Sequence, residues 1–93
     1  MRHVKRFQIL GHTIKVKKVR GLMKKHGCYG RWSELNQHIE IDPAQPDTLY
    51  AHTLWHEITH AILANLHYLE LNANEQLVDG IGGALAQIHA SMK

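Results

Sequence analysis

The sequence contains little cysteine, few aromatic residues and no long apolar segment. Cys28 is the one cysteine in 93 residues, which excludes an intrachain disulfide framework and a four-cysteine zinc site. No stretch approaches the roughly 18 apolar residues of a membrane-spanning helix, so no membrane partner is expected. The basic residues at the start lack the apolar run of a signal peptide. We therefore expect one domain over residues 1–93, located in the cytoplasm.

The first third of the chain also lacks acidic residues. Residues 1–31 contain ten Lys and Arg and no Asp or Glu, whereas residues 32–93 contain one Lys and all eight acids. Such a basic segment can bind nucleic acid, a membrane surface or an acidic partner, or it can pack beside the acidic part of the same domain. Its lysines alternate with apolar residues, and Phe7 and Tyr29 are its only aromatic residues, so a stacking platform for single strands is missing. The sequence therefore permits a nucleic-acid partner through this basic third but does not favour one.

Hydrophobic patterns predict four strands followed by two helices. The segments expected to form strands are residues 7–10, 13–19, 28–33 and 38–42, and residues 21–27 form a loop or one helical turn. Apolar spacings of three and four predict a helix that is capped by Asp47 or Thr48 and ends near Leu66. After a connection over residues 69–74, a second helix is expected to end near Ser91. The fold class is α+β, with a small, mostly antiparallel sheet of three to four strands before the two helices.

Three glycines lie within the second predicted helix, at Gly80, Gly82 and Gly83. Each glycine weakens a helix by roughly 1 kcal/mol relative to alanine. We therefore expect this helix to approach a neighbouring helix or strand closely at these positions.

The first predicted helix contains an HExxH pattern, His56-Glu57-Ile58-Thr59-His60. Residues four apart lie on one helix face, roughly 6 Å apart, so both imidazoles can bind one ion. Glu57 would lie toward the open side of the metal, where it can take a proton from a zinc-bound water and return it to a leaving amine. Between Thr48 and Asn65, Glu57 is the only residue with a formal charge, and such a lone carboxylate needs a partner.

A catalytic zinc site has three protein ligands and one open position. His67 follows the motif by seven residues, or about 10 Å along a continuous helix, which is too far to share the ion. Glu75 is a better third ligand, and Asp79 shares its helix face and can accept the other ring N–H of His56. A simpler role stays open, in which Glu75 only completes a capping box with Asn72 and Asp79 is a surface residue.

At these residues the sequence resembles the gluzincin metallopeptidases, whose pattern is HExxH on one helix and NExxxD on the next. Over most of residues 7–90 it is most similar to minimal forms, the small archaeal minigluzincins and the ImmA/IrrE-like peptidase domains of phage and bacteria. The resemblance implies a zincin-like fold with one zinc ion per chain, bound by His56, His60 and Glu75. It also implies that Glu57 is the general base and that Asp79 orients His56.

The same resemblance implies that a peptide substrate extends along the edge strand of the sheet, antiparallel to it. The corresponding strand covers residues 28–33 and includes Gly30, Arg31 and Trp32. Gly30 would permit close backbone approach, and Trp32 either forms a pocket wall or belongs to the core. Cys28, in the same segment, is expected to be inert.

No counterpart of the lower subdomain of larger gluzincins is expected after the second helix. The Tyr or His that stabilises the transition state in those enzymes would then have to come from elsewhere in the chain. Four residues are candidates, and the sequence does not decide among them: His52, His67, Tyr68 and His89.

The sequence thus predicts a zinc-dependent endopeptidase whose partner is a protein or peptide substrate. The alternative is a zinc-containing, peptidase-like module that binds a protein partner or nucleic acid without cleavage. Glu57 distinguishes the two, because only the enzyme needs a general base.

Overall fold

The computed structural model describes all 93 residues, which form a four-stranded sheet and four helices. In chain order the elements are β1 (Arg6–Ile9), β2 (His12–Lys18), α1 (Leu22–His26), β3 (Gly30–Ser33), β4 (His38–Ile41), α2 (Asp47–Asn65), α3 (Leu69–Asn72) and α4 (Glu75–Ser91). The α+β class is confirmed, and each predicted strand and helix is present within a few residues of its expected bounds. The structure adds α1, one of the two options for residues 21–27, and α3, where only a connection was expected.

The sheet is mixed, with strand order β1-β2-β4-β3. The two outer pairings, β1 with β2 and β3 with β4, are antiparallel, as expected for hairpins. The central pairing of β2 with β4 is parallel and places Val16 opposite Ile39. It arises because the chain passes through α1 and then β3 before β4 returns beside β2. This order leaves β3 at the edge of the sheet.

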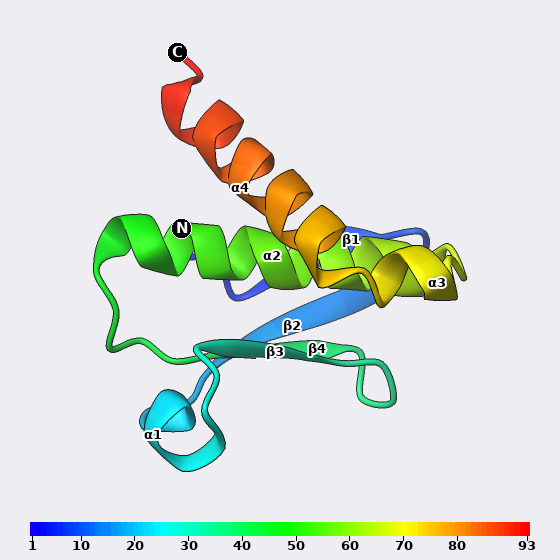
Figure 1. Cartoon of the computed structure of the whole chain (residues 1–93). Helices are drawn as coiled ribbons and strands as arrows, with labels where there is room; N and C mark the ends of the chain where they lie inside the picture. The colour runs from blue at the N-terminus through cyan, green and yellow to red at the C-terminus, as the bar shows by residue number, and fades with distance from the viewer.

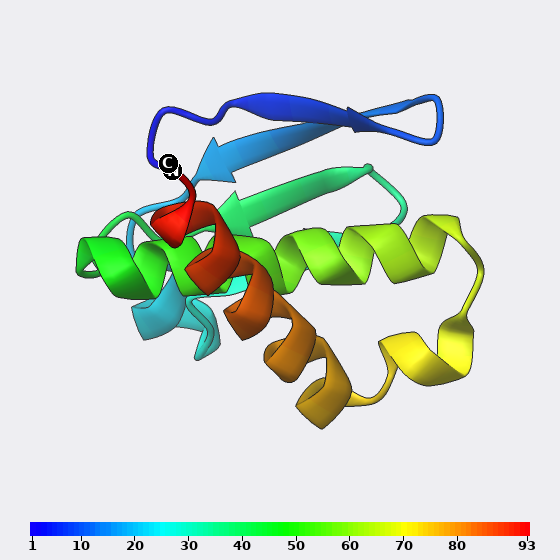
Figure 2. The same cartoon turned by 90° about the horizontal axis from the view of Figure 1, so that it is seen from above.

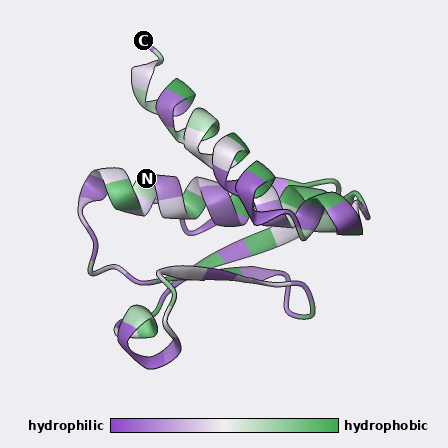
Figure 3. Ribbon diagram, in the orientation of Figure 1, coloured by the Kyte–Doolittle hydropathy of each residue, from purple (hydrophilic) through white to green (hydrophobic).

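The helices α2 and α4 lie on one side of the sheet, and only the short α1 lies toward the other (Figure 1). Seen from above, α2 runs over the half of the sheet formed by β3 and β4 (Figure 2). Hydrophobic and hydrophilic residues alternate along β2 (Figure 3), and the apolar ones point toward α2. The core consists of Ile14, Val16, Ile39 and Ile41 from the sheet and Tyr50, Leu54 and Ile58 from α2.

The ends of the two long helices differ from the expected capping. Pro46 is the N-cap of α2, and no side chain caps this helix. Asp47 is the first helical residue and pairs instead with Arg2, with 2.6 Å between Oδ1 and Nε. At α4 the N-cap is Asn74, whose Oδ1 accepts a hydrogen bond from the backbone N–H of Leu77 at 3.0 Å. Glu75 therefore begins α4 without a capping-box partner in α3.

α4 crosses α2 closely at two of the three expected glycines. A Cβ atom added to Gly82 would lie 2.7 Å from Cα of His56, whereas one added to Gly80 would have no heavy atom within 4 Å. At Gly83 the nearest atom would be Cε1 of His52, at 3.2 Å. The close approach is thus confirmed for Gly82 and Gly83 and is absent at Gly80. It brings the first turns of α4 beside the HExxH segment.

None of the helices combines the length and the hydropathy that crossing a membrane would require.

Candidate metal centre

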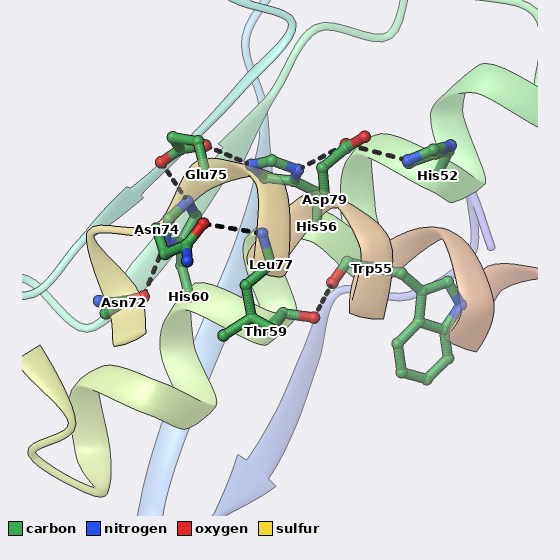
Figure 4. A network of polar contacts seen from close by, with 10 residues as sticks. All are labelled: His52, Trp55, His56, Thr59, His60, Asn72, Asn74, Glu75, Leu77 and Asp79. Atoms are coloured by element: carbon green, nitrogen blue, oxygen red, sulfur yellow. Dashed lines mark hydrogen bonds and ion pairs between the residues drawn. The ribbon is translucent and has the colours of Figure 1, made fainter. Parts of the chain in front are cut away.

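His56, His60 and Glu75 meet where the start of α4 passes over the middle of α2 (Figure 4). Nε2 of His56 lies 3.2 Å from one carboxylate oxygen of Glu75, and Nε2 of His60 lies 3.1 Å from the other. One ligand atom from each residue falls within 4.8 Å of the other two. Two imidazoles and one carboxylate are a ligand set typical of catalytic zinc sites. These three residues could hold a metal ion, as the sequence predicted for them.

Asp79 orients the first of these histidines. Its Oδ1 lies 3.0 Å from Nδ1 of His56, one turn of α4 beyond Glu75. A carboxylate oxygen can only accept, so Nδ1 donates, and in the neutral imidazole Nε2 is then the atom on the side of Glu75 that can bind a metal ion. Hydrogen bonding to His56 lowers the pKa of Asp79 below its ordinary value, so the acceptor is ionised. The structure therefore brings Asp79 to His56, where the sequence placed it.

Asn72 orients the second histidine, a contact that sequence reasoning missed. Oδ1 of Asn72, in the last turn of α3, lies 2.7 Å from Nδ1 of His60. An amide oxygen accepts only, so Nδ1 again donates and Nε2 faces Glu75. Both imidazoles are thus held in the tautomer that metal binding requires, by partners that supply acceptors. The only sequence signal at Asn72 was its place in an expected capping box, whereas the structure makes Asn74 the N-cap of α4.

Glu57 is buried beside the two histidines, and 6% of its surface is exposed. Burial raises the pKa of this carboxyl, and the nearby Glu75 raises it further, while His56 and His60 act in the opposite direction. The carboxylate faces β3, because a Cβ atom added to Gly30 would lie 3.1 Å from Cγ of Glu57 and 3.4 Å from Oε2. A carboxylate of raised pKa is a stronger base than one in water.

A cleft runs past Glu57 along the edge strand. It consists of two cavities, of about 270 Å³ and about 410 Å³, which share Gly30, His56 and Glu57 in their walls. His52 and Tyr29 line the first cavity. The second is also lined by Cys28, Arg31, Trp32, His60 and Glu75. The cleft therefore extends to both sides of the three possible ligands.

The three residues predicted for the edge strand have different places. Gly30 lies against α2, because a Cβ atom there would be 2.7 Å from Cγ2 of Thr53, so its missing side chain serves helix packing. Trp32 lines the cleft and also packs against the core, so both of its expected roles hold. Arg31 also lines the second cavity, but its guanidinium pairs with Glu40 on the outward face of the sheet, with 2.5 Å between Nε and Oε1.

Four residues were candidates for stabilising the transition state, and only His52 lies beside the metal centre. Its Nε2 is 3.1 Å from the same Asp79 oxygen that His56 contacts, and its ring lines the cleft (Figure 4). His89 packs instead against Trp55, with ring centroids 5.8 Å apart. His67 and Tyr68 follow the end of α2 and line a separate surface cavity with α3.

No protein-family model, no curated protein and no solved structure matches this chain.

Proposed function

We propose that this chain is a zinc-dependent endopeptidase of the gluzincin type, built as a minimal zincin-like domain of the kind found in minigluzincins and ImmA/IrrE-like peptidases. The observation that supports the proposal is the convergence of His56, His60 and Glu75 within 4.8 Å, next to the buried carboxylate of Glu57. A site that only stabilised the fold would have no use for a carboxylate held beside its open position.

Zinc bound by the three ligands would polarise the carbonyl of the peptide bond and make a water molecule more acidic. Glu57 takes a proton from the attacking water at its carboxylate and then gives that proton to the nitrogen of the leaving amine. The products are one new carboxyl and one new amino terminus, and Glu57 returns to its starting state. Asp79 and Asn72 keep the two imidazoles fixed through this cycle by accepting hydrogen bonds from their Nδ1–H groups.

The substrate would be an extended peptide paired with the free edge of β3. This strand pairs only with β4, so its outer N–H and C=O groups are available to another strand. The cleft along it reaches both sides of Glu57, so a peptide can continue past the scissile bond in both directions, as an endopeptidase requires. We also propose that the chain is located in the cytoplasm, where a free thiol such as that of Cys28 stays reduced.

The test combines metal content with one isosteric substitution. Protein purified without added metal should contain about one zinc per chain by elemental mass spectrometry. Glu57→Gln should retain this zinc and lose at least about 100-fold of the cleavage rate of an unstructured peptide mixture, since general-base catalysis is lost. Glu70→Gln is the matched control, because Glu70 is exposed on α3 and forms no ion pair.

Two results would contradict the proposal. If the protein contains no zinc and takes up none when zinc is added, these residues do not form a zinc site. If Glu57→Gln retains zinc and cleaves peptides as fast as the unmodified chain, Glu57 is not the general base. Zinc without any cleavage would favour the alternative, a peptidase-like module that binds its partner without hydrolysis.

A further inference from the structure

The face of the sheet that points away from α2 is open and basic. Because Ile14, Val16, Ile39 and Ile41 point to the core, the residues between them point outward. The charged residues on this outward face are Arg6, Lys15, Lys17, Arg31 and a single acid, Glu40. No helix other than α1 lies on this side, and α1 adds the exposed Lys24 and Lys25 at one end (Figure 1). We call these outward residues of the sheet, with α1, the basic face.

The acidic part of the chain does not neutralise this charge. Of the ten Lys and Arg in residues 1–31, only Arg2 and Arg31 lie within 4.0 Å of a carboxylate, and their partners are Asp47 and Glu40. The other eight form no ion pair. Apart from Asp47, the acids of α2 and α4 lie at the metal centre, on the other side of the sheet; they are Glu57, Glu75 and Asp79. Packing of the basic third against the acidic half, which the sequence left open, therefore does not explain the basic residues.

The arrangement of these cations also destabilises the sheet. Arg6 and Lys15 are directly opposite each other in the antiparallel β1–β2 pair, and like charges in that position repel. Lys15 is also the partner of His38 in β4. A sequence selected only for stability would place an acid or a neutral residue at one of these positions. The cations are therefore better explained by a ligand than by the sheet.

The composition of the basic face selects the kind of ligand. Protein–protein interfaces have apolar cores rich in aromatic residues and Met, and no such residue points outward from these strands. Interfaces with nucleic acid are more polar and much more positively charged. The absence of aromatic side chains excludes base stacking, so single strands gain little here. A duplex needs only its phosphates to be neutralised, and it carries about one negative charge per 1.7 Å of helix axis.

We propose that the basic face binds the phosphate backbone of double-stranded nucleic acid without sequence preference. The helices α2 and α4, which carry the residues of the metal centre, lie on the opposite side of the sheet (Figure 1), so the metal centre and the basic face can be used at once. A chain bound to a duplex would be held close to other proteins that are bound to the same nucleic acid. This inference does not rest on the proposed peptidase activity, because none of its residues belongs to the metal centre.

Fluorescence anisotropy with a labelled 20-base-pair DNA duplex of mixed sequence tests the proposal. We expect binding at 50 mM salt that weakens steeply as salt rises, as counterion release requires. The double variant Lys15→Gln, Lys17→Gln should weaken binding about tenfold at 50 mM salt and reduce the salt slope by about two, one per lost phosphate contact. Lys93→Glu is the matched control, because it changes the net charge by the same amount at the far end of α4. It should bind as the unmodified chain does.

A second measurement separates lost contacts from lost structure. Lys15→Gln alone removes the repulsion with Arg6, so its melting temperature should equal or exceed that of the unmodified chain while its affinity for the duplex falls. Glu57→Gln should bind the duplex normally, whatever its effect on cleavage. The proposal is overturned if the duplex does not bind at 50 mM salt, or if the double variant and Lys93→Glu bind equally well. It is also overturned if polyglutamate or anionic lipid vesicles bind more tightly than the duplex.

Discussion

Nδ1 of His60 lies 2.7 Å from Oδ1 of Asn72, and this contact joins α3 to the metal centre. α3 is only four residues long, and its side chains are mostly exposed. The hydrogen bond gives the short helix a fixed position against α2, immediately before the turn that delivers Glu75. The connection between the two long helices therefore contributes to the site directly, by orienting a ligand.

Replacing Asn72 should accordingly weaken metal binding. Asn72→Ala leaves Nδ1 of His60 without an acceptor, so the ring can rotate and change its tautomer. We expect zinc affinity, measured by competition with a chelating dye, to fall by about 10- to 100-fold. Asn36→Ala, in the exposed turn between β3 and β4, is the control and should bind zinc normally. Unchanged affinity in Asn72→Ala would show that the hydrogen bond does not orient the ligand.

The difference between Asp79 and Asn72 illustrates what the sequence could predict. Asp79 follows Glu75 by one helical turn, so regular spacing was enough to place both on the face that meets His56. Asn72 reaches His60 only because the chain forms a separate turn of helix over residues 69–72. A segment of one helical turn is too short for a periodic pattern to predict where its side chains point. The predicted capping box at Asn72 was wrong because Asn74 is one residue before α4 and occupies the cap itself.

The direction of the strands in the sheet is a second feature that the sequence pattern could not predict. Alternation in residues 13–19 and 38–42 predicted both central strands, because alternation depends on which face is buried. It has no information on whether two strands run in the same direction. The parallel pairing of Val16 with Ile39 depends on how α1 and β3 carry the chain around, which is a tertiary effect. The expected antiparallel pattern therefore held only where strands are joined by a short turn.

His52 should affect catalysis without affecting metal content. Its Nε2 shares the Asp79 oxygen with His56, but the residue is outside the ligand cluster. His52→Ala should therefore retain zinc and lower kcat/KM for peptide cleavage about 10- to 100-fold, because Asp79 and the cleft wall lose a fixed partner. His26→Ala, an exposed residue of α1, should leave both quantities unchanged. Loss of zinc in His52→Ala would instead identify a structural role.

Two glycines of α4 provide a matched pair for testing the helix crossing. A Cβ atom at Gly82 would lie 2.7 Å from Cα and 2.9 Å from N of His56, and backbone atoms cannot move aside cheaply. Gly82→Ala should lower the free energy of unfolding by about 1–3 kcal/mol, as overpacking does, and should weaken zinc binding by displacing Glu75. Gly80→Ala meets no atom within 4 Å and should raise the free energy of unfolding by about 0.5–1 kcal/mol. Urea unfolding of both variants measures the effect, and equal stabilities would contradict this packing.

Asp42 makes stability depend on pH, at a place remote from the metal ligands. Its side chain is buried at the end of β4, where Oδ1 accepts from the backbone N–H of Ala44 at 2.9 Å and Oδ2 from that of Met23 at 3.1 Å. The hydrogen bond from Ala44, followed by that from Met23, lowers the pKa of this carboxyl below its ordinary value of 3.8. The folded state thus favours the ionised form, which holds α1 and the loop after β4 together.

The sign of the effect follows from linkage. Because the folded pKa is lower than the unfolded one, the stabilisation is fully present above about pH 5 and is lost as the pH falls below 3.8 toward the folded pKa. Asp42→Asn cannot ionise, so it should be less stable than the unmodified chain at pH 7, and the difference should shrink by pH 3. Urea unfolding at the two pH values measures it, with Glu34→Gln, an exposed carboxylate that accepts no hydrogen bond, as the control. A stability difference that stays constant between pH 7 and pH 3 would mean that the lost hydrogen-bond geometry, and not the charge of Asp42, accounts for the effect.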